Sequence, residues 1–140
     1  MSSRPAPLAV AAASALLGAL VAVSPAHAQA PGGAAAPAPD LKRGRLLYIQ
    51  CRACHELKAG EPNKVGPNLH GFIGRKAAAV PDFAYSPALK SANLTWDRAT
   101  LERWLEKPSA VVAGNSMAFA GIPNAADRAS LIAYLEAETR

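Results

Sequence analysis

Both cysteines of the chain and one of its histidines stand in the segment CRACHEL, residues 51–57. Two thiols three residues apart could close a redox disulfide, supply half of a zinc site or bind a haem covalently. Thiols one helical turn apart can each add to a vinyl group on the same edge of a porphyrin, and the adjoining His55 then brings an imidazole nitrogen to the iron. Cys51, Cys54 and His55 therefore predict one covalently attached c-type haem.

The other two kinds of site find less support in the sequence. A structural zinc site needs four protein ligands, and beyond the motif only His70 is a nearby donor of that kind. A thioredoxin-like redox pair is expected between strands and helices, and no segment alternates as a strand does over a useful length. A structural disulfide between residues i and i+3 of a helix closes too small a loop to stabilise the chain by much.

An iron bound by His55 needs a second axial ligand or keeps an open position. His70 and Met117 are the candidates in the folded part of the chain. His70 lies close to His55 in the sequence and is awkward to bring to the opposite face of the ring. Met117 lies in the Gly-flanked segment VVAGNSMAFAGIP, where a methionine that only fills a helix face is not expected. We expect Met117 as the second ligand and His70 as an ordinary loop residue.

The two thiols fall at the end of a predicted helix. Asp40 is a suitable N-cap, and the helix is expected to run to about Ala53. Its apolar face, at positions i, i+3, i+4, i+7 and i+10, collects Gly44, Leu47, Tyr48, Cys51 and Cys54.

Two further segments carry the signals of helices. The second helix is expected over about 95–107, with Asp97 in its first turn. One side of it is lined by Leu101, Trp104, Leu105 and Pro108. The third begins after Asn124, and its apolar positions are Leu131, Tyr134 and Leu135. The Gly- and Pro-rich stretches 56–94 and 108–123 are long for loops, which makes sense if they wrap a large apolar cofactor.

The first third of the chain differs from this helical part. A basic residue near the N-terminus, the apolar stretch 8–23 and the small-x-small site at 26–28 predict a cleaved secretory leader over residues 1–28. An uncleaved anchor is the alternative, although a bilayer span takes about 20 apolar residues. Residues 29–39 read as an Ala-, Pro- and Gly-rich linker, and residues 40–140 as one domain of roughly 100 residues. Export places the domain in the periplasm.

The formal net charge of the chain is +5. The basic residues are interleaved with others, and the densest group is KRGR at 42–45. No basic stripe with interspersed aromatic residues appears, so nucleic acid is not expected as a partner.

Residues 51–135 resemble the class I cytochromes c, particularly mitochondrial cytochrome c and its bacterial periplasmic relatives. The matching runs, in chain order, are CRACH, KVGPNLHGFIGRK, LTW, LEKP, MAFAGI and LIAYL. The resemblance implies an all-α, single-domain fold, with three main helices and long loops wrapped around one covalently bound haem.

The resemblance also implies roles for single residues. Cys51 and Cys54 would carry the thioether bonds, with His55 as proximal and Met117 as distal iron ligand. Pro67 would face the proximal imidazole and fix its orientation. Without the resemblance, the remaining residues could be ordinary core aromatics or surface residues. The resemblance implies that Arg75, Tyr85 and Trp96 hold the haem propionates. It also implies that Phe119 covers the haem edge and that Asn115 contributes to haem binding. The first and last helices would meet at Gly44 and Tyr134.

The implied function is that of a periplasmic single-electron carrier between respiratory or photosynthetic partners. Six-coordinate iron leaves no site for a substrate, so no enzymatic activity is expected. The expected partners of the monomeric chain are a cytochrome reductase complex, a terminal oxidase or another acceptor, and membrane contact runs only through these partners or an uncleaved leader. The alternatives are a carrier tethered by residues 8–23 and a haem enzyme or sensor with a displaceable Met117.

One departure concerns the lysines that ring the haem edge of the mitochondrial relatives. Lys64 is kept. Neutral residues stand at the other matching positions, namely Gln50, Ser109, Ala110, Ser116, Pro123 and Asn124. Docking through a lysine ring is therefore less expected here.

Overall fold

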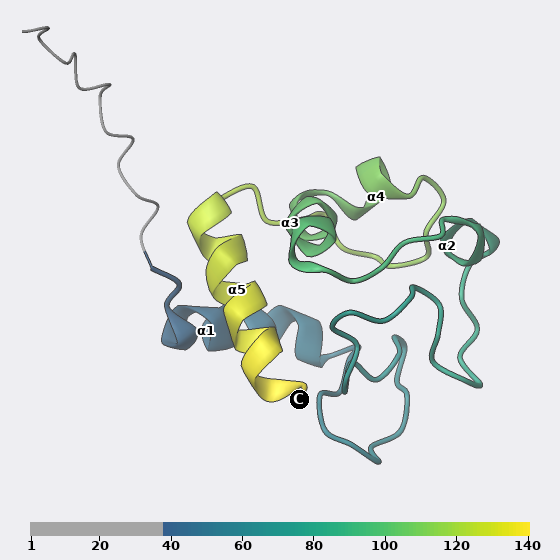
Figure 1. Cartoon of the computed structure of the whole chain (residues 1–140), viewed down its shortest axis with the longest axis horizontal. Coiled ribbons are helices and arrows are strands. Elements are labelled where there is room, and N and C mark those ends of the chain that lie inside the picture. Colours follow the sequence, from purple (N-terminus) through teal and green to yellow (C-terminus); the bar gives the residue numbers. More distant parts are fainter. Residues whose placement is uncertain (1–37) are drawn as a thin grey trace, which may run out of the picture. The chain divides into compact units, whose positions relative to one another are not determined.

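The computed structural model describes residues 38–140. The predicted leader over residues 1–28 and most of the predicted linker over 29–39 lie outside the described residues. Within 38–140 the regular structure is helical, apart from one isolated bridge between Lys76 and Thr95. The helices, shown in Figure 1, are α1 (Leu41–Arg52), α2 (Pro87–Ser91), α3 (Arg98–Glu106), α4 (Pro108–Val111) and α5 (Ala125–Glu138). Among these described helices, none combines the length and apolar character that a bilayer crossing requires.

Helix α1 begins where the sequence predicts, because Asp40 caps it. The Asp40 carboxylate accepts hydrogen bonds from the backbone N–H groups of Lys42 (2.8 Å) and Arg43 (3.2 Å). These are two of the N–H groups that a helix start leaves without an internal partner. The backbone N–H of Asp40 in turn donates to Ser130 Oγ of α5 at 3.1 Å. The cap therefore fixes both the start of α1 and its position against the last helix.

Helices α1 and α5 cross (Figure 1), and Gly44 of α1 lies against Ser130 and Tyr134 of α5. A Cβ at Gly44 would lie 2.6 Å from Tyr134 Cβ and would collide with the carbonyl oxygen of Ser130. Only glycine permits this approach of two backbones. The Arg43 guanidinium adds a bidentate pair to Asp127 of α5, at 2.7 and 2.6 Å. The predicted meeting of Gly44 and Tyr134 is confirmed.

Gly44→Val is expected to force α1 away from α5. Overpacking a close contact costs about 1–3 kcal/mol, and here part of the obstacle is backbone that cannot rotate aside. We expect the free energy of unfolding, measured with denaturant, to fall by at least about 2 kcal/mol. Leu46→Val on the outer face of α1, where Leu46 is 60% exposed, is the matched control and should cost less than about 0.5 kcal/mol. Equal losses in the two variants would contradict a tight crossing at Gly44.

Helix α3 supplies the apolar side that packs toward α5. The predicted side is confirmed, since Leu101, Trp104 and Leu105 of α3 are buried, and so is Pro108, which begins α4. The predicted start was wrong, because Asp97 is the N-cap and not a first-turn residue. Its carboxylate accepts from the Thr100 N–H at 2.7 Å, so α3 begins at Arg98.

Helix α5 closes the core between α1 and α3. Asn124 is its N-cap, as predicted, and accepts from the Asp127 N–H at 3.0 Å. Leu131 and Ile132 are completely buried, and Tyr134 is partly exposed beside α1. The three long helices thus form one core, and the remaining chain is carried around it.

Two short helices interrupt the stretches that the sequence predicts as loops. Helix α2 begins with Pro87 after Ser86, whose hydroxyl accepts from the Leu89 N–H at 3.2 Å. Helix α4 begins with Pro108 directly after α3. Proline is favoured at the first helical position because its missing N–H would have no partner there. Helices of five and four residues are too short to show a hydrophobic period, which is why they were missed.

Candidate haem-binding site

Cys51, Cys54 and His55 gather at the C-terminal end of α1. The backbone N–H groups of Cys54 and His55 both donate to the carbonyl of Cys51, at 3.0 and 2.9 Å. This turn brings the three side chains together, and each is half-buried. Neither cysteine forms a disulfide, and burial raises the pKa of the Cys51 thiol to about 11. Redox-active cysteines have a lowered pKa, and the environment of Cys51 acts in the opposite direction.

The His55 ring is held at one of its two nitrogens. Nδ1 lies 2.8 Å from the carbonyl oxygen of Pro67. Because a carbonyl only accepts, Nδ1 carries the proton, and Nε2 is left with a lone pair for a metal. Burial is the main cause that lowers the pKa of His55, which favours this neutral imidazole. The Pro67 contact that the resemblance implies is present.

Gly66 lets the loop before Pro67 approach the imidazole. Its N–H donates to the carbonyl of Cys54 at 2.8 Å. A Cβ at Gly66 would lie 2.8 Å from Nδ1 and 2.9 Å from Nε2 of His55, and would collide with Cε1. Gly66 and Pro67 thus lie directly against the His55 ring. Sequence reasoning missed this role, because Gly–Pro signals a turn without showing what the turn touches.

Tyr48 holds the backbone of His55. Its hydroxyl donates to the carbonyl oxygen of His55 at 2.9 Å, and its ring lies 5.7 Å from the ring of Tyr134. Burial is the main cause that raises the pKa of Tyr48 to about 12, so the hydroxyl remains a donor. The sequence places Tyr48 on the packed face of α1 but gives no sign of this bond.

Met117 lies half-buried in the segment 112–123, here called the Met117 loop. Its side chain packs against the hydrophobic core. The Asn115 side chain shapes the backbone on both sides: Nδ2 donates to the carbonyl of Val112 at 2.8 Å, and Oδ1 accepts from the Met117 N–H at 3.0 Å. The structure therefore shows Asn115 holding the main chain that carries Met117.

The residues expected near the propionates lie along the connection from α1 to α3. The backbones of Arg75 and Trp96 are paired, since the Trp96 N–H donates to the carbonyl of Arg75 at 2.9 Å. Trp96 is half-buried, and its ring meets that of Trp104 edge-on at 5.1 Å. Tyr85 is half-buried, and burial is the main cause that raises its pKa. The Arg75 guanidinium is exposed and reaches the carbonyl of Ala79 at 3.4 Å.

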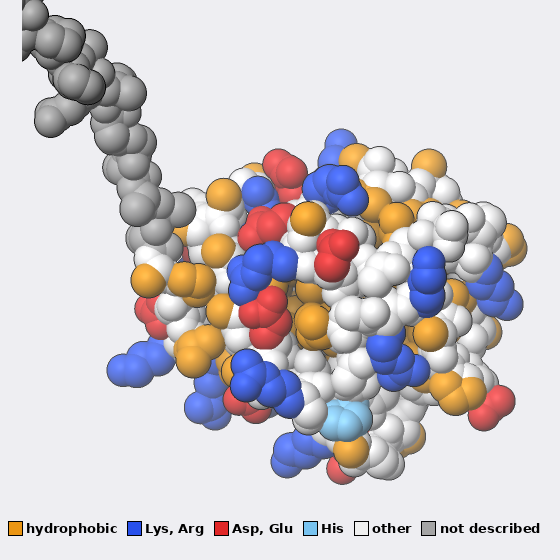
Figure 2. Space-filling model, in the orientation of Figure 1, with side chains coloured by type: hydrophobic (Ala, Val, Ile, Leu, Met, Phe, Trp, Pro, Cys, Tyr) orange, Lys and Arg blue, Asp and Glu red, His pale blue; other side chains and the backbone are white. Residues whose placement is uncertain are grey.

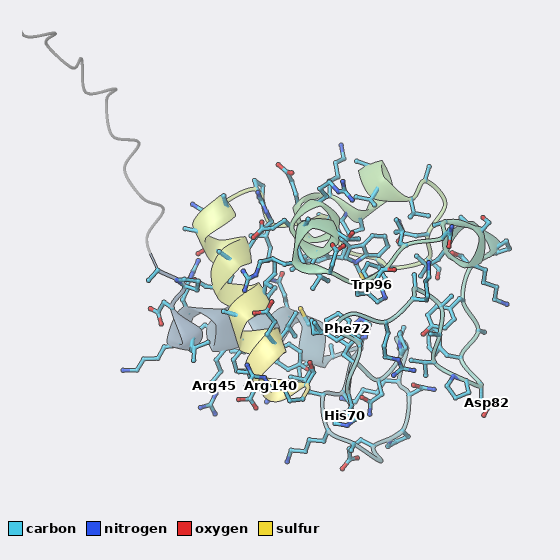
Figure 3. The ribbon with its side chains drawn as sticks, viewed as in Figure 1. Arg45, His70, Phe72, Asp82, Trp96 and Arg140 are labelled. Atoms are coloured by element: carbon cyan, nitrogen blue, oxygen red, sulfur yellow. The ribbon has the colours of Figure 1, made fainter. Side chains whose placement is uncertain are left out.

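His70 lies in a loop, as expected from the sequence. Its backbone N–H donates to Asn68 Oδ1 at 2.7 Å. Figure 3 shows it on the long connection between α1 and α2, away from the interior position of Trp96. Asn68 also folds this connection, because its Nδ2 donates to the carbonyls of Lys58 and Glu61 at 2.8 Å each. Sequence reasoning did not identify Asn68.

The side chains around these residues fit a haem. Apolar groups from α1, α2, α4 and the connecting segments pack on the core but stay only partly buried: Leu47, Leu69, Ile73, Leu89, Leu94, Trp96, Val111, Met117 and Phe119. A large apolar cofactor supplies the partner surface that such side chains need. With two free thiols and an imidazole whose Nε2 is available, the donor set is that of a c-type haem site.

Known proteins resemble this chain in sequence and in structure. Cytochrome c of Cochliobolus lunatus is 44% identical over 102 residues, which cover 72% of this chain and 94% of the relative. Cytochrome c2 of Rhodoblastus acidophilus is 44% identical over 96 residues, 69% of this chain and 90% of the relative. The chain belongs to the cytochrome c family. No model of a protein family matches it. The solved structure of cytochrome cH from Methylobacterium extorquens superposes with a TM-score of 0.66 at 40% identity, covering 70% of this chain and 98% of that one.

Family membership confirms the predicted class I cytochrome c fold and the predicted cofactor. This cytochrome c carries a haem attached through Cys51 and Cys54, and it is a haem-based electron carrier rather than an enzyme. The haem supplies one-electron chemistry at its iron. The chain's own residues would attach the ring through two thiols, hold the imidazole of His55 in one orientation and pack apolar side chains against the ring.

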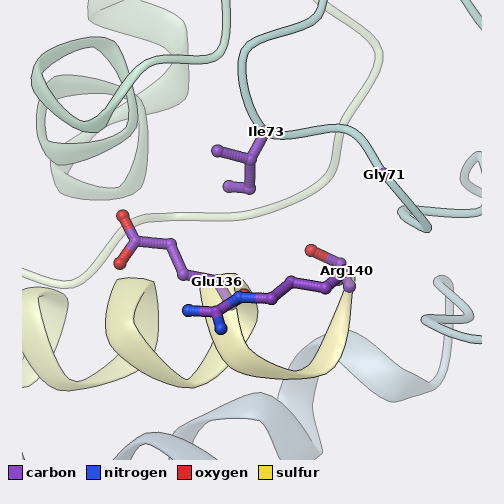
Figure 4. A pocket seen from close by; sticks show the side chains of 5 residues that line it. Gly71, Ile73, Glu136 and Arg140 are labelled. Atoms are coloured by element: carbon purple, nitrogen blue, oxygen red, sulfur yellow. The ribbon is translucent and has the colours of Figure 1, made fainter.

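Two surface hollows are found among the described residues. One, of about 320 Å³, lies where the end of α5 meets the long connection, and Figure 4 shows Glu136 and Arg140 facing Ile73 there. The Gly71 N–H donates to the carbonyl of Thr139 at 2.6 Å beside it. The other, of about 640 Å³, lies between α3, α4 and the end of the Met117 loop, where Arg103 and Val111 are among its lining residues. Each hollow shares one lining residue, Ile73 or Val111, with the apolar side chains around the haem site.

Proposed function

We propose that this cytochrome c is an exported single-electron carrier whose iron is bound by His55 and Met117. The observation that carries the proposal is the hydrogen bond from His55 Nδ1 to the carbonyl of Pro67, which fixes the ring and leaves Nε2 for the iron. Met117 is the one methionine within residues 40–140, and its thioether is a suitable iron ligand. It is half-buried in a loop whose backbone is held by the Asn115 side chain. A Met/His pair raises the haem potential and suits a donor to an oxidase.

The other haem contacts follow in the same proposal. Tyr85 and Trp96 are half-buried side chains that can offer an O–H and an N–H to propionates, and Arg75 can add a positive charge. Phe119 covers the haem edge next to Met117, supported by the bond from its N–H to the Met117 carbonyl at 2.9 Å. Asn115 contributes through the main chain of Met117.

Carbon monoxide separates an electron carrier from a haem enzyme or sensor. It binds ferrous haem with an open position, so the reduced carrier should keep its spectrum under carbon monoxide at neutral pH. A carbon monoxide complex that forms at once in the native protein would favour a displaceable Met117 and hence the enzyme or sensor. Imidazole-free buffer is required, because imidazole competes for the same position.

The proposed location is the periplasm, reached through the leader over residues 1–28. The small-x-small site at 26–28 motivates this proposal. Intact-mass measurement of periplasmic material should give a chain that begins at Gln29 and carries one haem. Material that stays in the membrane and retains residues 1–28 would support the tethered alternative.

The proposed partners are a reductase complex as donor and a terminal oxidase or photosynthetic acceptor, met by a monomer in brief encounters. The six neutral positions matching the mitochondrial lysine ring are all exposed: Gln50, Ser109, Ala110, Ser116, Pro123 and Asn124. Lys64 forms an ion pair with Glu56, so its positive charge is partly compensated within the chain. On the face in Figure 2, basic and acidic side chains are interspersed.

The rate of electron transfer to a purified acceptor should therefore depend only modestly on salt. Fewer cations at the haem edge leave less charge for electrostatic steering. The measurement is the second-order rate constant over a range of ionic strength. Gln50→Lys, which adds one cation at an exposed ring position, should steepen the dependence. A steep fall with added salt in the unmodified protein would show that Arg52, Lys58, Lys64 and Lys107 already form a steering patch.

A further inference from the structure

Arg128 is a buried arginine of α5, with 8% of its surface exposed. Its Nη1 donates to the carbonyl oxygens of Ile122 and Pro123, both at 2.8 Å. Its Nε donates to Glu102 Oε2 of α3 at 3.1 Å, and Glu106 lies 4.0 Å from Nη1. One side chain of the last helix thus joins α3 to the C-terminal end of the Met117 loop.

The same end of the loop is pressed onto α3 by its backbone. The Ile122 N–H donates to the carbonyl of Leu105 at 2.7 Å. Gly121 has a φ of +109°, and a Cβ there would collide with the carbonyl oxygen of Glu106. Arg128 completes this attachment, because it binds the carbonyls of Ile122 and Pro123 on the side of α5.

Met117 therefore lies between two fixed points of its loop. Asn115 holds the backbone before and at Met117 through the carbonyl of Val112 and the N–H of Met117. Arg128 holds the backbone that follows, through charge-assisted hydrogen bonds, which are stronger than neutral ones. Outward movement of the segment between these points would carry the Met117 thioether away from the iron.

We propose that Arg128 is a positioning residue for iron ligation by Met117. It fixes the C-terminal anchor of the Met117 loop and so keeps the population of the Met-dissociated state low. This inference rests on the proposed ligation by Met117. Because an added ligand binds only the dissociated state, its apparent affinity rises in proportion to the population of that state.

The test is an imidazole titration of the ferric holoprotein, followed by the far-red absorption band of the thioether ligand. Arg128→Met should tighten the apparent imidazole affinity, read from the loss of the band, by at least about tenfold. A tenfold change corresponds to about 1.4 kcal/mol in the opening equilibrium. Arg128→Lys, which keeps the charge and can reach one carbonyl, should fall between this variant and the unmodified protein. If Arg128→Met yields no holoprotein, Arg128→Lys and Glu102→Gln carry the test.

Arg98→Met is the matched control. Arg98 pairs with Glu136 at 2.6 Å and joins the same two helices, α3 and α5, from the exposed side. Its loss should lower the unfolding midpoint slightly and leave the imidazole affinity within about twofold, roughly 0.4 kcal/mol. An equal tightening in Arg98→Met would overturn the inference, because general loosening would then explain both.

Two further outcomes separate this inference from the proposed function. A far-red band in the unmodified protein with unchanged imidazole affinity in the Arg128 variants would overturn the role of Arg128 and leave the ligation by Met117 intact. Absence of the band from the unmodified ferric protein would overturn the ligation by Met117, and the role of Arg128 with it.

Discussion

Met117→Ala is expected to abolish the weak far-red absorption of the ferric protein and to open the iron to small ligands. Met117 is half-buried in a loop held by Asn115, and alanine cannot reach the iron in its place. The reduced variant should bind carbon monoxide at once. Its potential should fall by more than about 100 mV, since axial ligands set haem potentials over a range of about 0.8 V and methionine lies toward the high end.

The control is His70→Ala, which removes the other candidate ligand. His70 lies in the long connection, where its backbone bonds to Asn68. Its replacement should leave the far-red band, the potential and the absence of carbon monoxide binding unchanged. Persistence of the band in Met117→Ala, or its loss in His70→Ala, would show that the distal ligand has been misassigned.

Gly66→Ala is expected to disturb the proximal side to a similar extent. The added Cβ would meet three atoms of the His55 ring at less than 3.0 Å. The ring then has to leave the carbonyl of Pro67, or the turn at Gly66 has to leave the carbonyl of Cys54. Either change removes the restraint that orients the imidazole. We expect a sharply lower yield of holoprotein, and a mixed or high-spin ferric spectrum in the fraction that forms.

Gly60→Ala separates this steric effect from a general loss of stability. Gly60 has a φ of +77°, and a Cβ there would meet nothing within 4 Å. Alanine in a left-handed conformation costs about 1–2 kcal/mol, so this variant should unfold more easily. Its spectrum should nevertheless be that of the unmodified protein. A normal spectrum and yield in Gly66→Ala would mean that the loop does not rest on the His55 ring.

The three long helices could be predicted from the sequence because their signals are local. Asp40 and Asn124 act as N-caps at the predicted positions, and both caps use an oxygen two or three residues from the N–H groups they bind. Asp97 was placed in the first turn of a helix expected from about residue 95, whereas it is the N-cap of a helix that begins at Arg98, since an acidic residue suits both positions. The crossing at Gly44 came from the resemblance and not from periodicity, since the contact joins distant segments.

The covalent site could be predicted because its chemistry requires a fixed spacing of Cys51, Cys54 and His55. The supporting residues could not be derived in this way. Gly66 acts by what it lacks, Tyr48 acts through a hydroxyl seven residues from its acceptor, and Arg128 binds groups that only the tertiary fold brings together. The spacing of residues along the sequence does not reveal such contacts, because they depend on how the loops pack in the folded chain.

The most direct test of the account is an optical redox titration of the purified holoprotein at neutral pH. We expect a single one-electron transition at a positive potential between a ferric form with the far-red thioether band and a low-spin ferrous form, both carrying one haem per chain. That result requires a c-type haem with one sulfur ligand, as the proposed ligation by His55 and Met117 demands. A ferric form without the far-red band, or a low potential with a high-spin ferrous form, would contradict a His55–Met117 electron carrier.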